Sequence, residues 1–108
     1  MKNIAIALIM MSSVGANSST NVETAKWLAP CSVLSNNASM DNAGYMSKKF
    51  QEIYKASSNK EKDKIMKISF DFAVSIIQAT AGMSETAKKG VYYMAYDSMK
   101  CERNLKGL

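Results

Sequence analysis

Few residues in this sequence can do chemistry, and the two cysteines come first among them. Cys31 and Cys101 are the only cysteines, and the chain contains no histidine. A distant pair without histidine or a Cys-x-x-Cys spacing is a poor metal or redox site. Two cysteines in a small chain are typical of a structural disulfide. We therefore predict a Cys31–Cys101 bond that stabilises the fold by about 4 kcal/mol.

Catalytic groups are scarce in the rest of the sequence. Without histidine there is no Ser–His or Cys–His nucleophile pair. Ser57 and Lys60 have the spacing of a serine–lysine pair, but they fall at a predicted helix junction in a very small chain. The carboxylates alternate with lysines on polar helix faces, where solvation explains them. These are Glu52, Glu61, Asp63, Asp71, Glu85 and Glu102. We predict that the protein is not an enzyme.

Methionine is the remaining metal-binding residue type. Thioether sulfur can bind copper(I), but Met46, Met66 and Met94 fall on predicted apolar helix faces, where methionine fills gaps in a core. No histidine or thiolate accompanies them. We therefore predict neither a metal nor another cofactor.

A set of tyrosine and basic residues recurs with helical spacing near the end of the chain. Its members are separated by four, three, four and three positions: Lys89, Tyr93, Tyr96, Lys100 and Arg103. Exposed tyrosines among basic side chains are enriched in recognition surfaces. We predict that this face binds a partner protein. In the alternative, a loop or the N-terminal segment with Trp27 covers the two tyrosines.

The sequence predicts that helices position these residues. Apolar residues recur at spacings of three and four over about 22–34, 41–56, 59–81 and 84–103. Ser58 and Glu61 fit a capping box, and Gly82 fits a helix stop. Pro30 predicts an interruption of the first segment after Leu28. Apolar residues cover most of the third segment's circumference, which predicts that it is the central helix.

The first residues have the pattern of a secretory signal peptide. Lys2 precedes the apolar run 4–11, and small residues follow, with Val14 and Ala16 suited to a cleavage site. The run is too short to span a bilayer. We assign residues 1–16 to the signal peptide and 17–108 to a single helical domain, with no transmembrane segment after cleavage.

Together these patterns predict an all-α fold, a small bundle of about four helices closed by one disulfide. A formal net charge of +5 is mild and spread along the chain, and for an exported protein we predict no nucleic-acid partner. The leading functional hypothesis is a periplasmic or secreted binding protein that acts as an accessory, inhibitor or immunity factor for another protein. The sequence leaves the oligomeric state open.

Two other functions remain as alternatives. The layout resembles that of the small periplasmic acid chaperones, with Trp27 and Cys31 near the start of a helical core and Cys101 near its end. That resemblance implies a chaperone that acts in acid. A secreted toxin or small enzyme is the third reading.

The signal peptide generates the first testable prediction. Protein exported by a bacterial host should begin at or near Asn17, because Val14 and Ala16 suit the −3 and −1 positions of the cleavage site. Intact-mass measurement of the periplasmic fraction checks this, and retention of Met1 in that fraction would contradict it.

Overall fold

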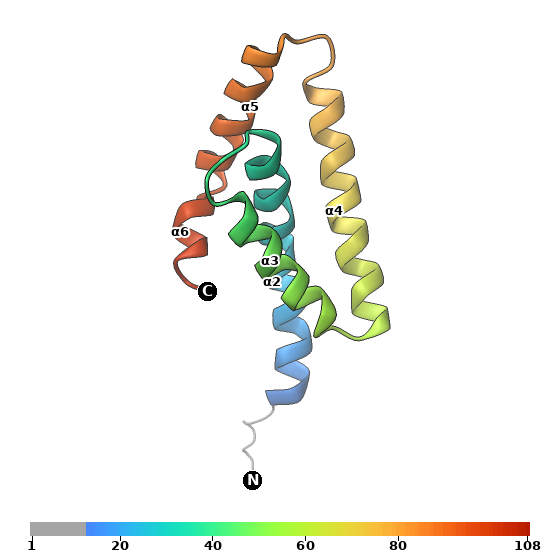
Figure 1. Ribbon diagram of the computed structural model, residues 1–108. Helices are drawn as coiled ribbons and strands as arrows, with labels where there is room; N and C mark the ends of the chain where they lie inside the picture. The colour runs from blue at the N-terminus through green and yellow to red at the C-terminus, as the bar shows by residue number, and fades with distance from the viewer. Residues whose placement is uncertain (1–12) are drawn as a thin grey trace.

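The computed structural model describes the backbone of residues 13–108 and the side chains of residues 21–108 (Figure 1). Within that range the chain forms helices and turns and no strand. The helices are α2 (Ser13–Asn37), α3 (Ala43–Lys55), α4 (Asn59–Ala79), α5 (Glu85–Ser98) and the short α6 (Cys101–Leu105). The predicted all-α bundle with its disulfide is confirmed.

The predicted signal peptide lies mostly outside the described residues. Residues 1–12 are not described, and α2 begins at Ser13, so the predicted cleavage site falls in the first turns of that helix. The export of the chain therefore stays a prediction. Among the described helices, none is both long and apolar enough to cross a membrane.

The central helix is α2, and the prediction that the third segment is central was wrong. α2 packs against α3, α4, α5 and α6, while α4 touches α3 over only a short stretch. The apolar side chains of α2 that are almost completely buried are Ala25, Leu28, Ala29, Cys31 and Leu34. On α4, Ile65 and Ile76 are buried against the bundle. A second apolar arc adjoins them, which we had also assigned to the core; its large side chains, Met66, Phe70 and Ile77, are exposed.

The predicted interruption at Pro30 was also wrong, because α2 continues through this residue. An internal proline removes one backbone hydrogen bond and costs roughly 3 kcal/mol in an isolated helix. Here Pro30 is itself buried, as are its neighbours Ala29 and Cys31. Tertiary burial on this segment therefore outweighs the local preference for a break.

The start and the end of α4 follow the predicted signals. The Ser58 side chain accepts a hydrogen bond from the Glu61 backbone N–H at 3.2 Å, and the Glu61 carboxylate accepts one from the Ser58 N–H at 2.8 Å. This reciprocal capping box is the predicted one. Beyond the helix, Gly82 has a φ of 80°, a left-handed conformation that glycine adopts without strain. The chain then turns toward α5, which Ser84 caps.

The last predicted helix is broken near its end. α5 stops at Ser98, and Lys100 adopts a left-handed conformation with a φ of 56° before α6 begins at Cys101. The predicted continuous helix over 84–103 was therefore wrong. The turn redirects the chain so that Cys101 meets Cys31, with the two Cα atoms 5.7 Å apart and the sulfur atoms bonded.

The face of α5 that packs on the core also differs from the predicted one. We expected Ala87, Val91, Met94, Ala95 and Ser98 to form the packing seam with Cys101. Of these, Ala95 packs on the core and Cys101 is buried, but the other core residues are the buried Tyr96 and, packed against the core cluster, Tyr92 and Met99. Ala87, Met94 and Ser98 are exposed. Large rings remove more apolar area from water than alanine or serine, so the helix is turned toward them.

The disulfide generates the second prediction. Thiol labelling of the unreduced, denatured protein should find no free cysteine. Replacing both cysteines by alanine should lower the free energy of unfolding by about 4 kcal/mol, because the bond closes a long loop in the unfolded chain. Urea denaturation of the double variant and of the oxidised protein measures the difference. An unchanged transition midpoint would contradict the structural role of the bond.

Candidate partner-binding surface

The predicted tyrosine and basic face of the last helix is only partly exposed. Lys89, Lys100 and Arg103 face solvent, and Tyr93 is 48% exposed. Tyr96 is 5% exposed and belongs to the core cluster. The expectation that both tyrosines share one solvent-facing surface was therefore wrong for Tyr96, because α5 turns this ring toward the core and leaves Tyr93 half-exposed.

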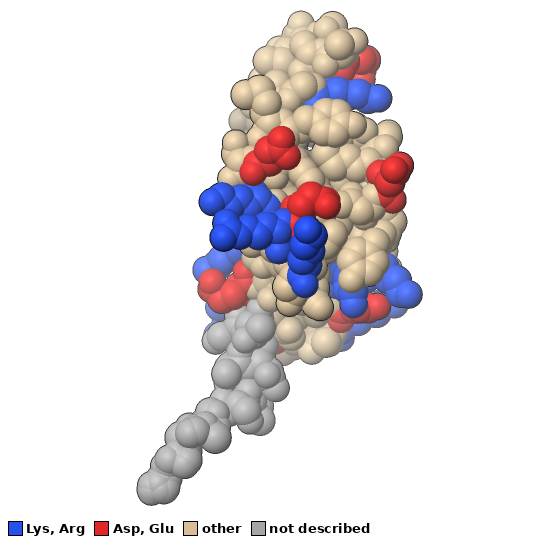
Figure 2. Space-filling view, turned by 90° about the vertical axis from the view of Figure 1, so that its left-hand side faces the viewer, with Lys and Arg blue, Asp and Glu red and all other residues tan. Residues whose placement is uncertain are grey.

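The remaining exposed residues define what we call the α5–α6 face: Lys89, Tyr93, Lys100 and Arg103. Figure 2 faces the side of the molecule on which α5 and α6 lie in Figure 1, and it shows basic side chains gathered there with acidic side chains beside them. The positions of two basic residues depend on α6. Lys100, in a left-handed conformation, directly precedes this helix, and Arg103 lies in its last turn. A partly exposed ring near basic side chains suits recognition of another protein.

Tyr96 instead organises a polar network beneath this face. Its hydroxyl donates a hydrogen bond to the Glu102 carboxylate. The Asn42 side-chain amide donates to the Tyr96 hydroxyl at 2.7 Å and to the same Glu102 oxygen at 2.7 Å. Three elements meet in this network: the start of α3, the last turns of α5 and the first turn of α6. It holds α6 in place together with the disulfide.

Asn42 takes part in this network and does not cap α3 with its side chain. It occupies the N-cap position of α3, where asparagine commonly accepts a hydrogen bond from the first turn, but its side chain caps nothing. Its Oδ1 atom is buried without a hydrogen-bond partner. Asn42 lies 54 residues from Tyr96 and 60 from Glu102 in the sequence, so no local pattern could have revealed their contact.

The environment of Tyr96 changes its acidity. Burial, and then the hydrogen bond to Glu102, raise the pKa of Tyr96 to about 12, above its ordinary value of 10.0. The neutral phenol is therefore favoured in the folded state. The contribution of the neutral Tyr96 phenol to the free energy of unfolding is complete below about pH 10, and it is lost as the pH rises toward about 12.

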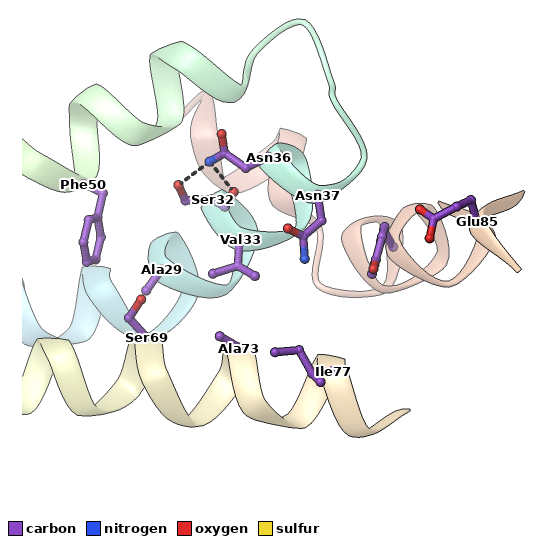
Figure 3. Close-up of a pocket in the computed structure, with 11 residues that line it drawn as sticks. Ala29, Ser32, Val33, Asn36, Asn37, Phe50, Ser69, Ala73, Ile77 and Glu85 are labelled. Atoms are coloured by element: carbon purple, nitrogen blue, oxygen red, sulfur yellow. Dashed lines mark hydrogen bonds between the residues drawn. The ribbon is translucent and has the colours of Figure 1, made fainter. Parts of the chain in front are cut away.

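A pocket that sequence reasoning missed lies between α2, α3, α4 and α5. It has a volume of about 690 Å³. Figure 3 shows Val33 and Asn37 of α2 above Ala73 and Ile77 of α4, with Phe50 of α3 at one end and Glu85 of α5 at the other. The second apolar arc of α4 was assigned to the core, so the hollow beside it was not foreseen.

The serine–lysine spacing of Ser57 and Lys60 falls at the junction of α3 and α4. The Ser57 hydroxyl donates to the Ile53 carbonyl oxygen at 2.7 Å, which is an ordinary contact at a helix end. Lys60 is exposed. Within the described residues, no three His, Cys, Asp or Glu side chains lie close enough together to hold a metal ion.

Comparison with known proteins adds no further constraint on the site. No family model, no curated protein and no solved structure matches this chain. The residues themselves must therefore support any functional argument.

Tyr96 generates the third prediction. Tyr96→Phe removes the hydroxyl that links Asn42 to Glu102 and should lower the free energy of unfolding at neutral pH by about 1–2 kcal/mol. The variant should also lose less stability than the wild type between about pH 10 and about pH 12, because it lacks the phenol whose pKa is raised. Urea denaturation across that range measures both effects. Equal alkaline losses in the two proteins would contradict the assignment.

Proposed function

We propose that this protein is an exported, non-enzymatic binding protein that acts on another protein through its α5–α6 face. The observation that carries the proposal is Tyr93, which is 48% exposed on α5. Lys89 is exposed on the same helix, and Lys100 and Arg103 are exposed in the turn and the helix that follow it. Tyrosine in such a setting can become the buried anchor of an interface, while the basic residues form its rim.

The way this face is held supports the proposal. α6 is joined to α2 by the disulfide and to α3 by the Asn42–Tyr96–Glu102 network. A surface fixed before binding loses little conformational entropy when a partner arrives, so more of the contact energy appears as affinity. A small protein with a preformed surface suits an accessory, inhibitor or immunity factor, which works by occupying its target.

Charge indicates the kind of target surface. The chain has a formal net charge of +5, and three of the four residues of the α5–α6 face are basic. Basic rim residues steer association with a negatively charged surface and lose that effect as salt screens them. We therefore propose an acidic patch on the partner protein. The periplasm is the proposed compartment, from the signal-peptide pattern and the disulfide.

Position 93 provides the fourth prediction. A photoreactive amino acid at position 93 should capture the partner in the native host, because this residue should contact it. Tyr93→Ala should then weaken binding of the purified partner by roughly 30-fold, which corresponds to about 2 kcal/mol for an interface anchor. Calorimetry measures the affinity, and a thermal melt should show nearly unchanged stability.

Met83 supplies a control, because it is 40% exposed and lies in the turn between α4 and α5. A photoreactive residue at position 83 should capture nothing, and Met83→Ala should bind normally. Charge reversal by Lys100→Glu should slow association, most of all at low salt. Full affinity of the Tyr93→Ala variant would refute the proposed site.

A further inference from the structure

The outward face of α4 carries large apolar side chains that nothing in the described part of the chain covers. Phe70 and Ile77 are each 68% exposed, and Met66 is 50% exposed. Isolated exposed apolar residues are ordinary, but these three recur along one helix face with Ala73 between them. A contiguous stripe of this kind marks an interaction surface.

The order of residues in the stripe indicates what covers it. Met66, Phe70, Ala73 and Ile77 are separated by four, three and four positions. This is the spacing of a coiled-coil seam, and it reads the same in both directions. If the α4 helix of a second copy packs antiparallel to the first, Met66 of each copy lies opposite Ile77 of the other, and Phe70 of each lies opposite Ala73 of the other. We propose that two copies of this protein associate through antiparallel α4 helices about a two-fold axis.

The shape of the surface fits this occupant. Ala73 has the smallest side chain of the stripe and lines the pocket between α2 and α4, with Val33 above it (Figure 3). The Phe70 ring is the largest side chain of the stripe and projects from the same helix. In the antiparallel pair, the Phe70 ring of each copy lies against Ala73 of the other, at the edge of the pocket. This reciprocal contact is what a two-fold interface requires.

Charges beside the seam permit the pairing. Lys67 flanks the stripe and is already paired with Asp71, with 2.9 Å between Nζ and Oδ2. In the antiparallel register Lys67 falls opposite Val74 of the other copy, so its aliphatic stem covers an apolar residue and no like charges face each other. The net charge of +5 on each copy opposes association at long range. Added salt should therefore strengthen the dimer.

The available area sets the expected strength. Aromatic side chains carry on the order of 150–250 Å² each. If Met66 and Ile77 are taken at the low end of that range, the exposed parts of Met66, Phe70 and Ile77 supply roughly 300–400 Å² per copy. With Ala73, Val74 and the stem of Lys67, the total for two copies approaches the ~1,000–1,200 Å² at the low end of specific interfaces. We therefore expect a dimer with a dissociation constant in the micromolar range.

Sedimentation equilibrium of the purified oxidised protein, from low micromolar to millimolar concentration, tests the proposal and is the fifth prediction. The wild type should dimerise, and Phe70→Glu should raise the dissociation constant at least tenfold, because it places a charge in the seam. Met94→Glu is the matched control, since Met94 is 70% exposed on α5, and it should dimerise normally. Far-UV circular dichroism verifies that each variant is folded.

Spin labels test the orientation of the helices. Cysteines introduced by Asp71→Cys or Asp63→Cys are the only free thiols for labelling, because the native pair is bonded. In the antiparallel dimer the labels at position 71 lie close together, and those at position 63 are separated by about 25 Å along the helix axis. A monomer at all concentrations, equal weakening by Met94→Glu, or equal label distances at the two positions would each overturn the proposal.

The proposed dimer does not depend on the proposed partner-binding function, and the experiments separate the two. Tyr93→Ala should leave dimerisation unchanged. Salt should weaken binding of an acidic partner but strengthen the dimer, since it screens attraction in one case and repulsion in the other.

Discussion

The covalent bond between Cys31 and Cys101 joins the most buried helix of the bundle to the shortest one. α6 has five residues and would not be stable as an isolated helix. Its attachment to α2 places Glu102 beside Tyr96, and the Asn42 amide then ties the same point to α3. Lys100 adopts its left-handed conformation at the residue before the bond. The bond therefore fixes where α6 lies against α2, and the hydrogen-bond network fixes it against α3 and α5.

The elements that could be predicted from the sequence are those with local signals. The start of α4 follows from Ser58 and Glu61, because a capping box involves residues three positions apart. The turn at Gly82 follows from the need for a positive φ. The pairing of the cysteines followed from their number. The prediction at Pro30 was wrong because its local preference was outweighed by burial against other helices, which no local pattern contains.

The candidate site shows the same division. Helical spacing placed Tyr93 and Tyr96 on one face, but Tyr93 is half-exposed and Tyr96 is buried. The break between α5 and α6 also ends the helical register before Lys100 and Arg103. The hydroxyl of the buried Tyr96 bonds to Glu102, six residues away, and to Asn42, which is 54 residues away and which no local pattern could have revealed. α4 has two apolar arcs, and only packing on α2 decides which one is buried.

The position of the two cysteines also affects how the molecule withstands proteases. Residues 31–101 form a covalent ring that includes the end of α2, all of α3, α4 and α5, and the turns between them. Exposed turns are the usual sites of proteolytic cleavage, and the stretch 81–84 between α4 and α5 is one. A single cut there opens the ring but leaves both fragments joined through sulfur. The two fragments therefore stay covalently linked after a cleavage that would separate an unlinked chain of the same fold into two molecules.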